Sequence, residues 1–90
     1  MISVRLPTPL RPFAGGLALV RVQGASLRAA LADLSRLHPG LEARLLDGRG
    51  ALRAHVNVFV NEEDARSLGG LDAPLSDGDE LLVVPAIAGG

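Results

Sequence analysis

Residues 26–40, SLRAALADLSRLHPG, are the stretch that decides the fold. Leucine or alanine recurs every three or four residues, at positions 27, 30, 31, 34 and 37, and this spacing predicts an amphipathic helix. Ser26 is a suitable N-cap, and Pro39 and Gly40 predict the end of the helix, because a residue before proline avoids helical angles and Gly40 is able to take positive φ. A helix with one apolar stripe buries that stripe against another element. A sheet is therefore expected on one side of the helix.

Short alternating or apolar runs on both sides of the helix predict the strands of that sheet. Before the helix, residues 2–6 alternate and residues 17–23, LALVRVQ, form a second run. Prolines at positions 7, 9 and 12 predict irregular chain between these two strands, ending in a glycine turn at 15–16. After the helix, residues 55–61, HVNVFVN, alternate clearly. A last strand at 80–84 follows an Asp-Gly turn at 77–78.

The two remaining segments give weaker signals. Residues 41–54 predict a short helical turn followed by an Asp47-Gly48 turn. Residues 62–79 are polar and rich in turn residues, with room for one short strand or 3₁₀ turn near 66–68. The expected order is therefore strand, strand, helix, strand, a short strand, strand.

This order predicts an α+β fold. The helix packs on one face of the sheet, and the last strand pairs parallel with the first after a crossover. The ββαβ(β) order is the β-grasp (ubiquitin-like) arrangement, a mixed sheet of four or five strands with one main helix packed on one face. We expect residues 1–84 to form this domain, and residues 85–90 to form a flexible tail that ends in Gly-Gly.

Composition argues against several classes of function. The 90 residues include no cysteine, so disulfides, thiolate metal sites and cysteine-ligated iron–sulfur clusters are absent. The net charge of −1 argues against nucleic acid as the main partner. No apolar run reaches the roughly 18 residues of a membrane span, and the N-terminus does not resemble a signal peptide. We therefore expect a cytoplasmic protein with no membrane partner.

The polar side chains do not form a recognisable catalytic arrangement. His38 lies at the predicted helix C-terminus, where it interacts favourably with the helix dipole. The acidic residues at 62–64, and those at 77 and 79, are interpreted as solvated turns rather than as a metal site. We expect no catalytic activity from this chain alone, no metal and no stably bound cofactor.

Residues 75–90, LSDGDELLVVPAIAGG, resemble the C-terminal signature of the ThiS/MoaD sulfur carriers. That signature has a Gly-Asp turn, an apolar strand, a proline, a short tail and a terminal Gly-Gly. Over residues 6–16 and 55–90 the chain is most similar to the CysO-type carriers of cysteine biosynthesis. The terminal position of Gly89-Gly90 makes the motif specific, whereas an internal Gly-Gly has little meaning.

The resemblance implies that Gly90 carries the reactive carboxylate. A separate ubiquitin-activating-like adenylyltransferase is expected to adenylate it with ATP and Mg, and sulfur then converts it to a thiocarboxylate. Gly89 allows entry into a narrow channel because glycine lacks Cβ. Pro85 stiffens the exit from the last strand. The six residues after Val84 reach roughly 20 Å when extended, and the tail residues that provide this reach are Pro85, Ala86, Ile87 and Ala88.

A docking surface is expected beside the tail, because a carboxylate alone offers little specificity. If the three valines at 56, 58 and 60 face the helix, Phe59 faces the other way, as do Leu82 and Val84 on the last strand. With Pro7 they predict an exposed apolar patch that binds a partner. The alternative is that they are ordinary exposed residues, or that the loop at 7–16 covers them.

Several destinations for the sulfur are compatible with the resemblance. A CysO-like carrier delivers sulfur to an activated serine through a cysteine-synthase-like enzyme, and a metallopeptidase releases the product. The alternatives are a carrier for thiamin thiazole or molybdopterin synthesis, a ubiquitin-like modifier of protein lysines, or a non-covalent interaction module. All nine basic residues are arginine, so a modifier of this sequence has no side-chain amine on which to build chains. We place cysteine biosynthesis first, because that similarity covers most of the chain.

Overall fold

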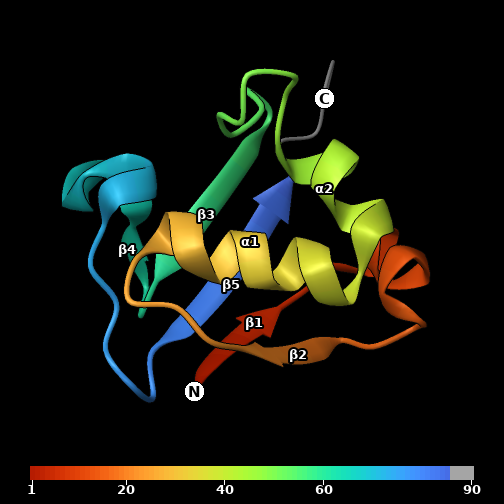
Figure 1. The fold of residues 1–90 in the computed structure, drawn as a ribbon, viewed down its shortest axis with the longest axis horizontal. Coiled ribbons are helices and arrows are strands. Elements are labelled where there is room, and N and C mark those ends of the chain that lie inside the picture. The colour runs from red at the N-terminus through yellow and green to blue at the C-terminus, as the bar shows by residue number, and fades with distance from the viewer. Residues whose placement is uncertain (86–90) are drawn as a thin grey trace.

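The computed structural model describes residues 1–85, and residues 86–90 lie outside the described part (Figure 1). The chain forms five strands, two α-helices and three 3₁₀ helices within that range. In order they are β1 (Ile2–Arg5), η1 (Thr8–Ala14), β2 (Leu19–Val22), α1 (Leu27–Leu37), α2 (Pro39–Leu45), β3 (Val56–Val60), β4 (Glu63–Asp64), η2 (Ala65–Leu68), η3 (Gly70–Asp72) and β5 (Glu80–Pro85).

The strands form one mixed sheet in the order β2-β1-β5-β3-β4. β5 pairs parallel with β1, with Leu81 opposite Val4, and antiparallel with β3, with Leu82 opposite Phe59. The outer pairs, β1 with β2 and β3 with β4, are antiparallel. The predicted parallel return of the last strand is therefore confirmed, and it places β5 in the middle of the sheet.

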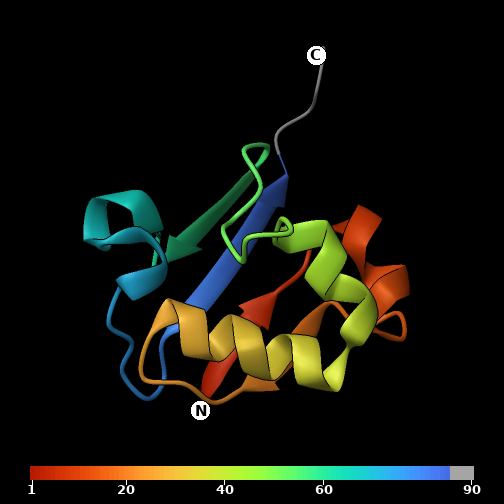
Figure 2. The ribbon, with the colours of Figure 1, turned by 45° about the horizontal axis from the view of Figure 1, so that its top comes forward.

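α1 lies across one face of the sheet, as predicted (Figure 2). The Ser26 hydroxyl accepts a hydrogen bond from the Ala29 N–H at 3.2 Å, so Ser26 is the N-cap. The apolar stripe of α1 is buried, consisting of Leu27, Ala30, Leu31 and Leu34. The inward residues of β5, Leu81 and Val83, have no exposed surface. Each such side chain contributes about 1.5–3 kcal/mol on burial, so this layer is a main source of stability.

The short helical turn predicted after Gly40 is a second α-helix, which is longer than expected and follows α1 directly. α2 begins at Pro39, and Gly40 lies within it without positive φ. Proline fits the first turn of a helix, where its missing N–H has no intrahelical partner, so Pro39 both ends α1 and begins α2. The buried residues Leu41 and Leu45 attach α2 to the core, and α2 packs between α1 and η1.

The prediction of irregular chain around the first three prolines is also wrong. Residues Thr8–Ala14 form the 3₁₀ helix η1 even though Pro12 lies inside it. Gly15 ends η1 in the left-handed conformation, with φ of 65°. Leu10 and Ala14 are buried, so tertiary packing favours the helix despite the prolines.

The other boundaries differ from the predictions by one or two residues. β1 ends at Arg5 rather than at residue 6, and β2 covers the middle of the predicted run at 17–23. β5 includes Pro85, which lies opposite Val56, so this strand is one residue longer than predicted. The 3₁₀ turn expected near 66–68 is present as η2. None of the helices found in residues 1–85 is long and apolar enough to cross a membrane.

We expect Gly24→Ala to destabilise the fold strongly, because Gly24 lies against the backbone of α1. A Cβ on Gly24 would lie 2.8 Å from the Ala29 carbonyl carbon and from the Ala30 Cα. Overpacking of this kind costs about 1–3 kcal/mol or more, which urea denaturation would measure. Gly48→Ala is the matched control, because its Cβ meets nothing within 4 Å, and we expect a change below about 0.5 kcal/mol. Equal stabilities of the two variants would contradict this account of the β2–α1 connection.

Candidate functional site

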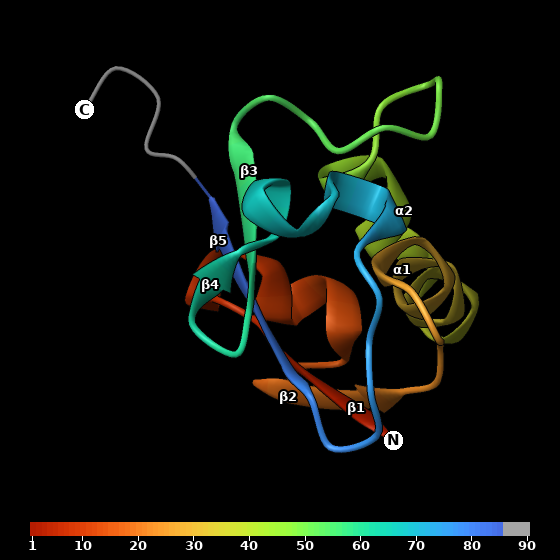
Figure 3. The same cartoon turned by 90° about the vertical axis from the view of Figure 1, so that its left-hand side faces the viewer.

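The sheet has two unlike faces, because both α-helices lie on one side of it (Figure 3). On the other, outer face, the side chain of Leu82 is 39% exposed. Phe59 and Val84 are half-buried on the same face, whereas their strand neighbours Val58 and Val83 are buried. The predicted outward direction of Phe59, Leu82 and Val84 is therefore confirmed.

Strand register aligns three apolar residues in one row across the outer face, with Arg5 between two of them. Leu82 lies opposite Phe59 on β3 and opposite Arg5 on β1, and Arg5 in turn lies opposite Leu19 on β2. Leu19 is 37% exposed. The sequence prediction missed Leu19, although the alternation of residues 17–23 carried the signal. With Val20 and Val22 directed inward, Leu19 has to face outward.

Val84 and Pro7 lie nearer to Pro85, the end of β5, than Leu82 and Leu19 do. Val84 is opposite Asn57, and Pro7 lies two residues beyond Arg5, half-buried in extended conformation at the start of η1. η1 does not cover Leu82, since that side chain remains exposed. We call the outer-face set Leu19, Leu82, Phe59, Val84 and Pro7 the outer apolar face.

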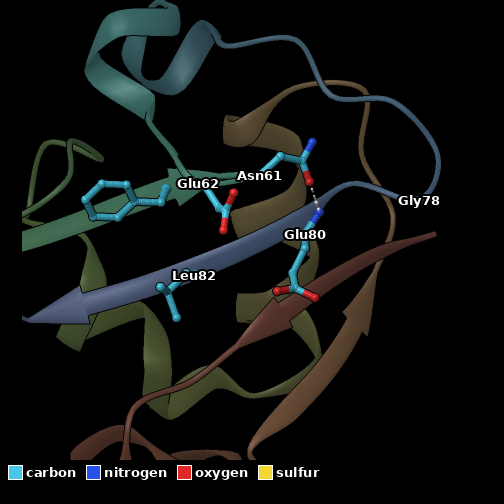
Figure 4. Close-up of a pocket in the computed structure, with 6 residues that line it drawn as sticks. Asn61, Glu62, Gly78, Glu80 and Leu82 are labelled. Carbon is cyan, nitrogen blue, oxygen red and sulfur yellow. Dashed lines mark hydrogen bonds between the residues drawn. The ribbon is translucent and has the colours of Figure 1, made fainter.

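An open hollow of about 710 Å³ lies at the end of the outer face where β5 begins (Figure 4). It is lined by Phe59, Asn61, Glu62, Gly78, Glu80 and Leu82. It therefore joins two predicted docking residues, Phe59 and Leu82, to polar residues that the sequence prediction did not include. Val84 and Pro7 do not line it.

Asn61 holds the β3–β4 turn against the start of β5. Its side-chain oxygen accepts a hydrogen bond from the Glu80 N–H at 2.9 Å, and its amide nitrogen donates to an Asp79 carboxylate oxygen at 2.9 Å. The Asn61 N–H donates to the Glu80 carbonyl at 2.9 Å. The Ser76 N–H also donates to an Asp79 carboxylate oxygen. The hydrogen bond from Ser76 is the larger cause, and the one from Asn61 the smaller cause, of a pKa of Asp79 that lies below its ordinary value of 3.8. The three hydrogen bonds of Asn61 thus position the polar edge of the hollow.

The acidic turns have structural roles in this network. Asp64 caps η2 by accepting a hydrogen bond from the Arg66 N–H at 2.9 Å, and Asp79 closes the turn before β5. His38 donates its N–H to the Leu34 carbonyl at the end of α1. Among residues 1–85 no three His, Asp or Glu side chains are grouped to hold a metal ion.

The predicted reactive end cannot be placed against this face. Gly89 and Gly90, and the reach residues Ala86, Ile87 and Ala88, lie outside the described residues. Pro85 is described, half-buried as the last residue of β5. Because Leu82 and Val84 are also on β5, one central strand carries part of the outer apolar face and continues into the tail.

A mixed five-stranded sheet with α1 in the crossover defines a β-grasp, ubiquitin-like protein. Solved structures agree. A chain of the Amycolatopsis orientalis BexX/CysO complex superposes with a TM-score of 0.93 at 41% identity, covering 100% of both chains. SAMP1 from Haloferax volcanii superposes with a TM-score of 0.85 at 35% identity, covering 99% of this chain and 98% of that one.

Sequence comparison then defines the family. The ThiS family model matches residues 4–90. The sulfur carrier protein CysO of Mycobacterium tuberculosis is 42% identical over 91 residues, which cover 99% of this chain and 98% of that protein. The chain belongs to the ThiS family, as its C-terminal signature predicted.

We expect Asp79→Asn to reduce the acid sensitivity of the fold. Because the native pKa of Asp79 is lowered, its stabilising effect is complete above the unfolded value of 3.8 and is lost as the pH falls through the lower native value. Thermal unfolding between about pH 5 and about pH 2 should therefore show a smaller loss of stability in the variant. Asp72→Asn is the control, since that exposed carboxylate is paired with Arg28 at the surface. Identical pH profiles for wild type and Asp79→Asn would contradict the role of this network.

Proposed function

We propose that this chain is a sulfur carrier whose Gly90 carboxylate is adenylated by a separate enzyme and converted to a thiocarboxylate. The observation that carries the proposal is the ThiS family match, which extends over residues 4–90 and so includes the Gly-Gly end. The full-length relative from M. tuberculosis is a sulfur carrier protein rather than a catalyst. In this role the chain is a protein co-substrate, and its own folded domain performs no chemical step.

The proposed chemistry explains why a partner has to supply ATP. A carboxylate is a poor acyl donor, because its leaving group would be oxide or hydroxide. Attack by the Gly90 carboxylate on the α-phosphorus of ATP releases pyrophosphate and leaves an acyl-adenylate. A sulfur nucleophile then attacks the acyl carbon and displaces AMP, which leaves the thiocarboxylate. ATP and Mg belong to the activating enzyme in this scheme, and the carrier binds no cofactor of its own.

The folded domain contributes recognition. The outer apolar face offers a partner a surface to bind. Phe59 and Leu82 lie at the centre of this surface as cross-strand neighbours. A partly exposed apolar set of this kind on one face of a small domain favours a protein interface. A related carrier, the A. orientalis CysO, has been crystallised in complex with BexX, which supports partner binding by this fold.

We propose three partners for this chain. The first is a ubiquitin-activating-like adenylyltransferase, and the second is a cysteine-synthase-like enzyme that accepts the sulfur. The third is a metallopeptidase that releases the product. We place the protein in the cytoplasm, where ATP and amino-acid biosynthesis are found. The similarity to CysO over the whole chain favours cysteine over thiazole or molybdopterin as the destination.

Protein modification is a second candidate function, favoured by a different observation. The chain is 36% identical to small archaeal modifier protein 3 of H. volcanii over 66 residues, which cover 73% of this chain and 71% of that protein. A modifier would join Gly90 to target lysines through an isopeptide bond. Gly-Gly remnants on target lysines after proteolysis would favour this function over sulfur transfer. A purely non-covalent module would instead keep its function after removal of the tail.

We expect adenylation to depend on the last residue. Pyrophosphate exchange with ATP, catalysed by the activating enzyme, should occur with the wild-type chain, decrease sharply with Gly90→Ala and disappear when Gly90 is deleted. The methyl group of alanine hinders entry of the chain into the narrow channel of the activating enzyme. The deletion withdraws the carboxylate by one residue, about 3.3–3.6 Å. Gly48→Ala serves as a control glycine change far from the tail in sequence. Full exchange with the deletion variant would contradict the assignment of Gly90.

We expect the thiocarboxylate form to donate sulfur to an activated serine. Incubation with O-phosphoserine and the cysteine-synthase-like enzyme should give a carrier with cysteine joined to Gly90, detected by intact mass. The free-carboxylate form is the control and should give no adduct. If the loaded carrier gives no cysteine adduct but supports thiazole or molybdopterin formation, the destination is wrong while the carrier class stands.

A further inference from the structure

The turn between β3 and β4 contains a strained glutamate. Only Asn61 and Glu62 separate the two strands, and both have positive φ, 48° and 76°. A two-residue hairpin turn with positive φ at both positions favours asparagine first and glycine second. Asn61 fits this pattern, whereas Glu62 stands where glycine is preferred. The fold therefore tolerates a cost at Glu62 that a glycine would remove.

The Glu62 side chain lies over the hollow on the outer face. It is directed over β5, on the same face as Leu82 and Glu80 (Figure 4). Glu62 is exposed and has no ion pair among residues 1–85. The other carboxylate of the hollow, Glu80, is paired with Arg5, with Nε and Oε1 3.4 Å apart. Glu62 is thus the carboxylate at this rim that is accessible to an incoming cation.

The turn that carries Glu62 is held in place by its neighbour rather than by the Glu62 side chain itself. Asn61, its neighbour in the turn, is joined to Asp79 and Glu80 by the three hydrogen bonds described above. A group that is already held in its binding geometry loses less conformational entropy on association. The strain at Glu62 and the rigidity of its turn together favour a binding role over a role in stability.

The segment of chain that supplies Glu62 and Glu80 to this rim is acidic. Residues 62–80 contain seven acidic residues and one arginine, a net charge of −6, whereas residues 1–61 contain three acidic residues and eight arginines, a net charge of +5. The sum is the −1 of the whole chain. A segment of one charge sign beside an apolar hollow attracts a partner of the opposite sign.

We propose that Glu62 is a specificity-determining residue of the outer apolar face, accepting a charge-assisted hydrogen bond from an arginine or lysine of the activating enzyme. An apolar side chain of the same enzyme fills the hollow beside Phe59 and Leu82, next to that cation. This inference rests on the proposed function, since the activating enzyme is the partner. Its physical basis is charge complementarity at the rim of an apolar contact, which sets partner choice and association rate.

The test compares single-residue variants for binding to the activating enzyme by calorimetry at low and high salt. Glu62→Gln removes the charge and should weaken binding about 5–10-fold at low salt, with a smaller effect at high salt. Glu63→Gln is the matched control: Glu63 lies opposite Val60, whose side chain is buried on the helix side, so it is off the hollow. We expect its affinity to stay within about twofold of wild type.

Glu62→Gly separates binding from folding. Glycine relieves the positive φ, so the thermal midpoint should rise by about 4 °C, while binding weakens as it does for Glu62→Gln. A stability gain together with an affinity loss is the signature of a residue kept for binding. No gain in midpoint, or a gain with unchanged affinity, would overturn the inference.

Phe59→Asp shows whether a negative result concerns Glu62 alone or the whole proposed docking face. If the enzyme does not bind the wild-type chain, the proposed function and the role of Glu62 both fail. If it binds wild type and Phe59→Asp equally, the face is wrong, and the role of Glu62 fails with it. If Phe59→Asp weakens binding but Glu62→Gln behaves like Glu63→Gln, only the role of Glu62 is overturned.

Discussion

The parallel pairing of β5 with β1 is the constraint on which the rest of the structure depends. It sets Leu81 opposite Val4 and brings the last strand into the centre of the sheet, between β1 and β3. Both of these side chains are fully buried beneath the helix layer. Because side chains alternate along a strand, burial of Leu81 and Val83 directs Leu82 and Val84 to the outer face. A shift of one residue would exchange the two sets, so the core fixes the composition of the outer face.

A single strand therefore joins recognition to chemistry. β5 supplies Leu82 to the apolar row, carries Glu80 beside the hollow, and ends at Pro85, where the chain continues to Gly90. A partner that binds the outer face is held next to the strand from which the tail begins. In the proposed role, the folded domain supplies the surface that a partner binds, and the terminal carboxylate is the group that reacts.

The sequence predicted most of the elements, because periodicity is a local property. The helix at Ser26, the alternation of residues 55–61 and the C-terminal signature led to the β-grasp fold and to the outward position of Phe59 and Leu82. α2 was predicted only as a short helical turn, because seven residues contain only two turns, and its start was missed because Pro39 also predicts an ending. The outward direction of Leu19 was in the alternation of residues 17–23, but its alignment with Leu82 and the existence of the hollow depend on cross-strand register, which is set by contacts distant in sequence. The positive φ of Glu62 has no sequence signal, since glycine is the residue expected there.

The central claim is that Gly90 carries sulfur, and intact-protein mass spectrometry tests it most directly. The protein would be isolated from its native cells under non-acidic conditions, with an alkylating reagent added at lysis to trap the thiocarboxylate before it hydrolyses. The account predicts a species whose mass reflects one oxygen replaced by alkylated sulfur, with fragmentation locating the change at Gly90. A chain that carries only the free carboxylate in cells actively making cysteine, or a modification located elsewhere, would contradict it.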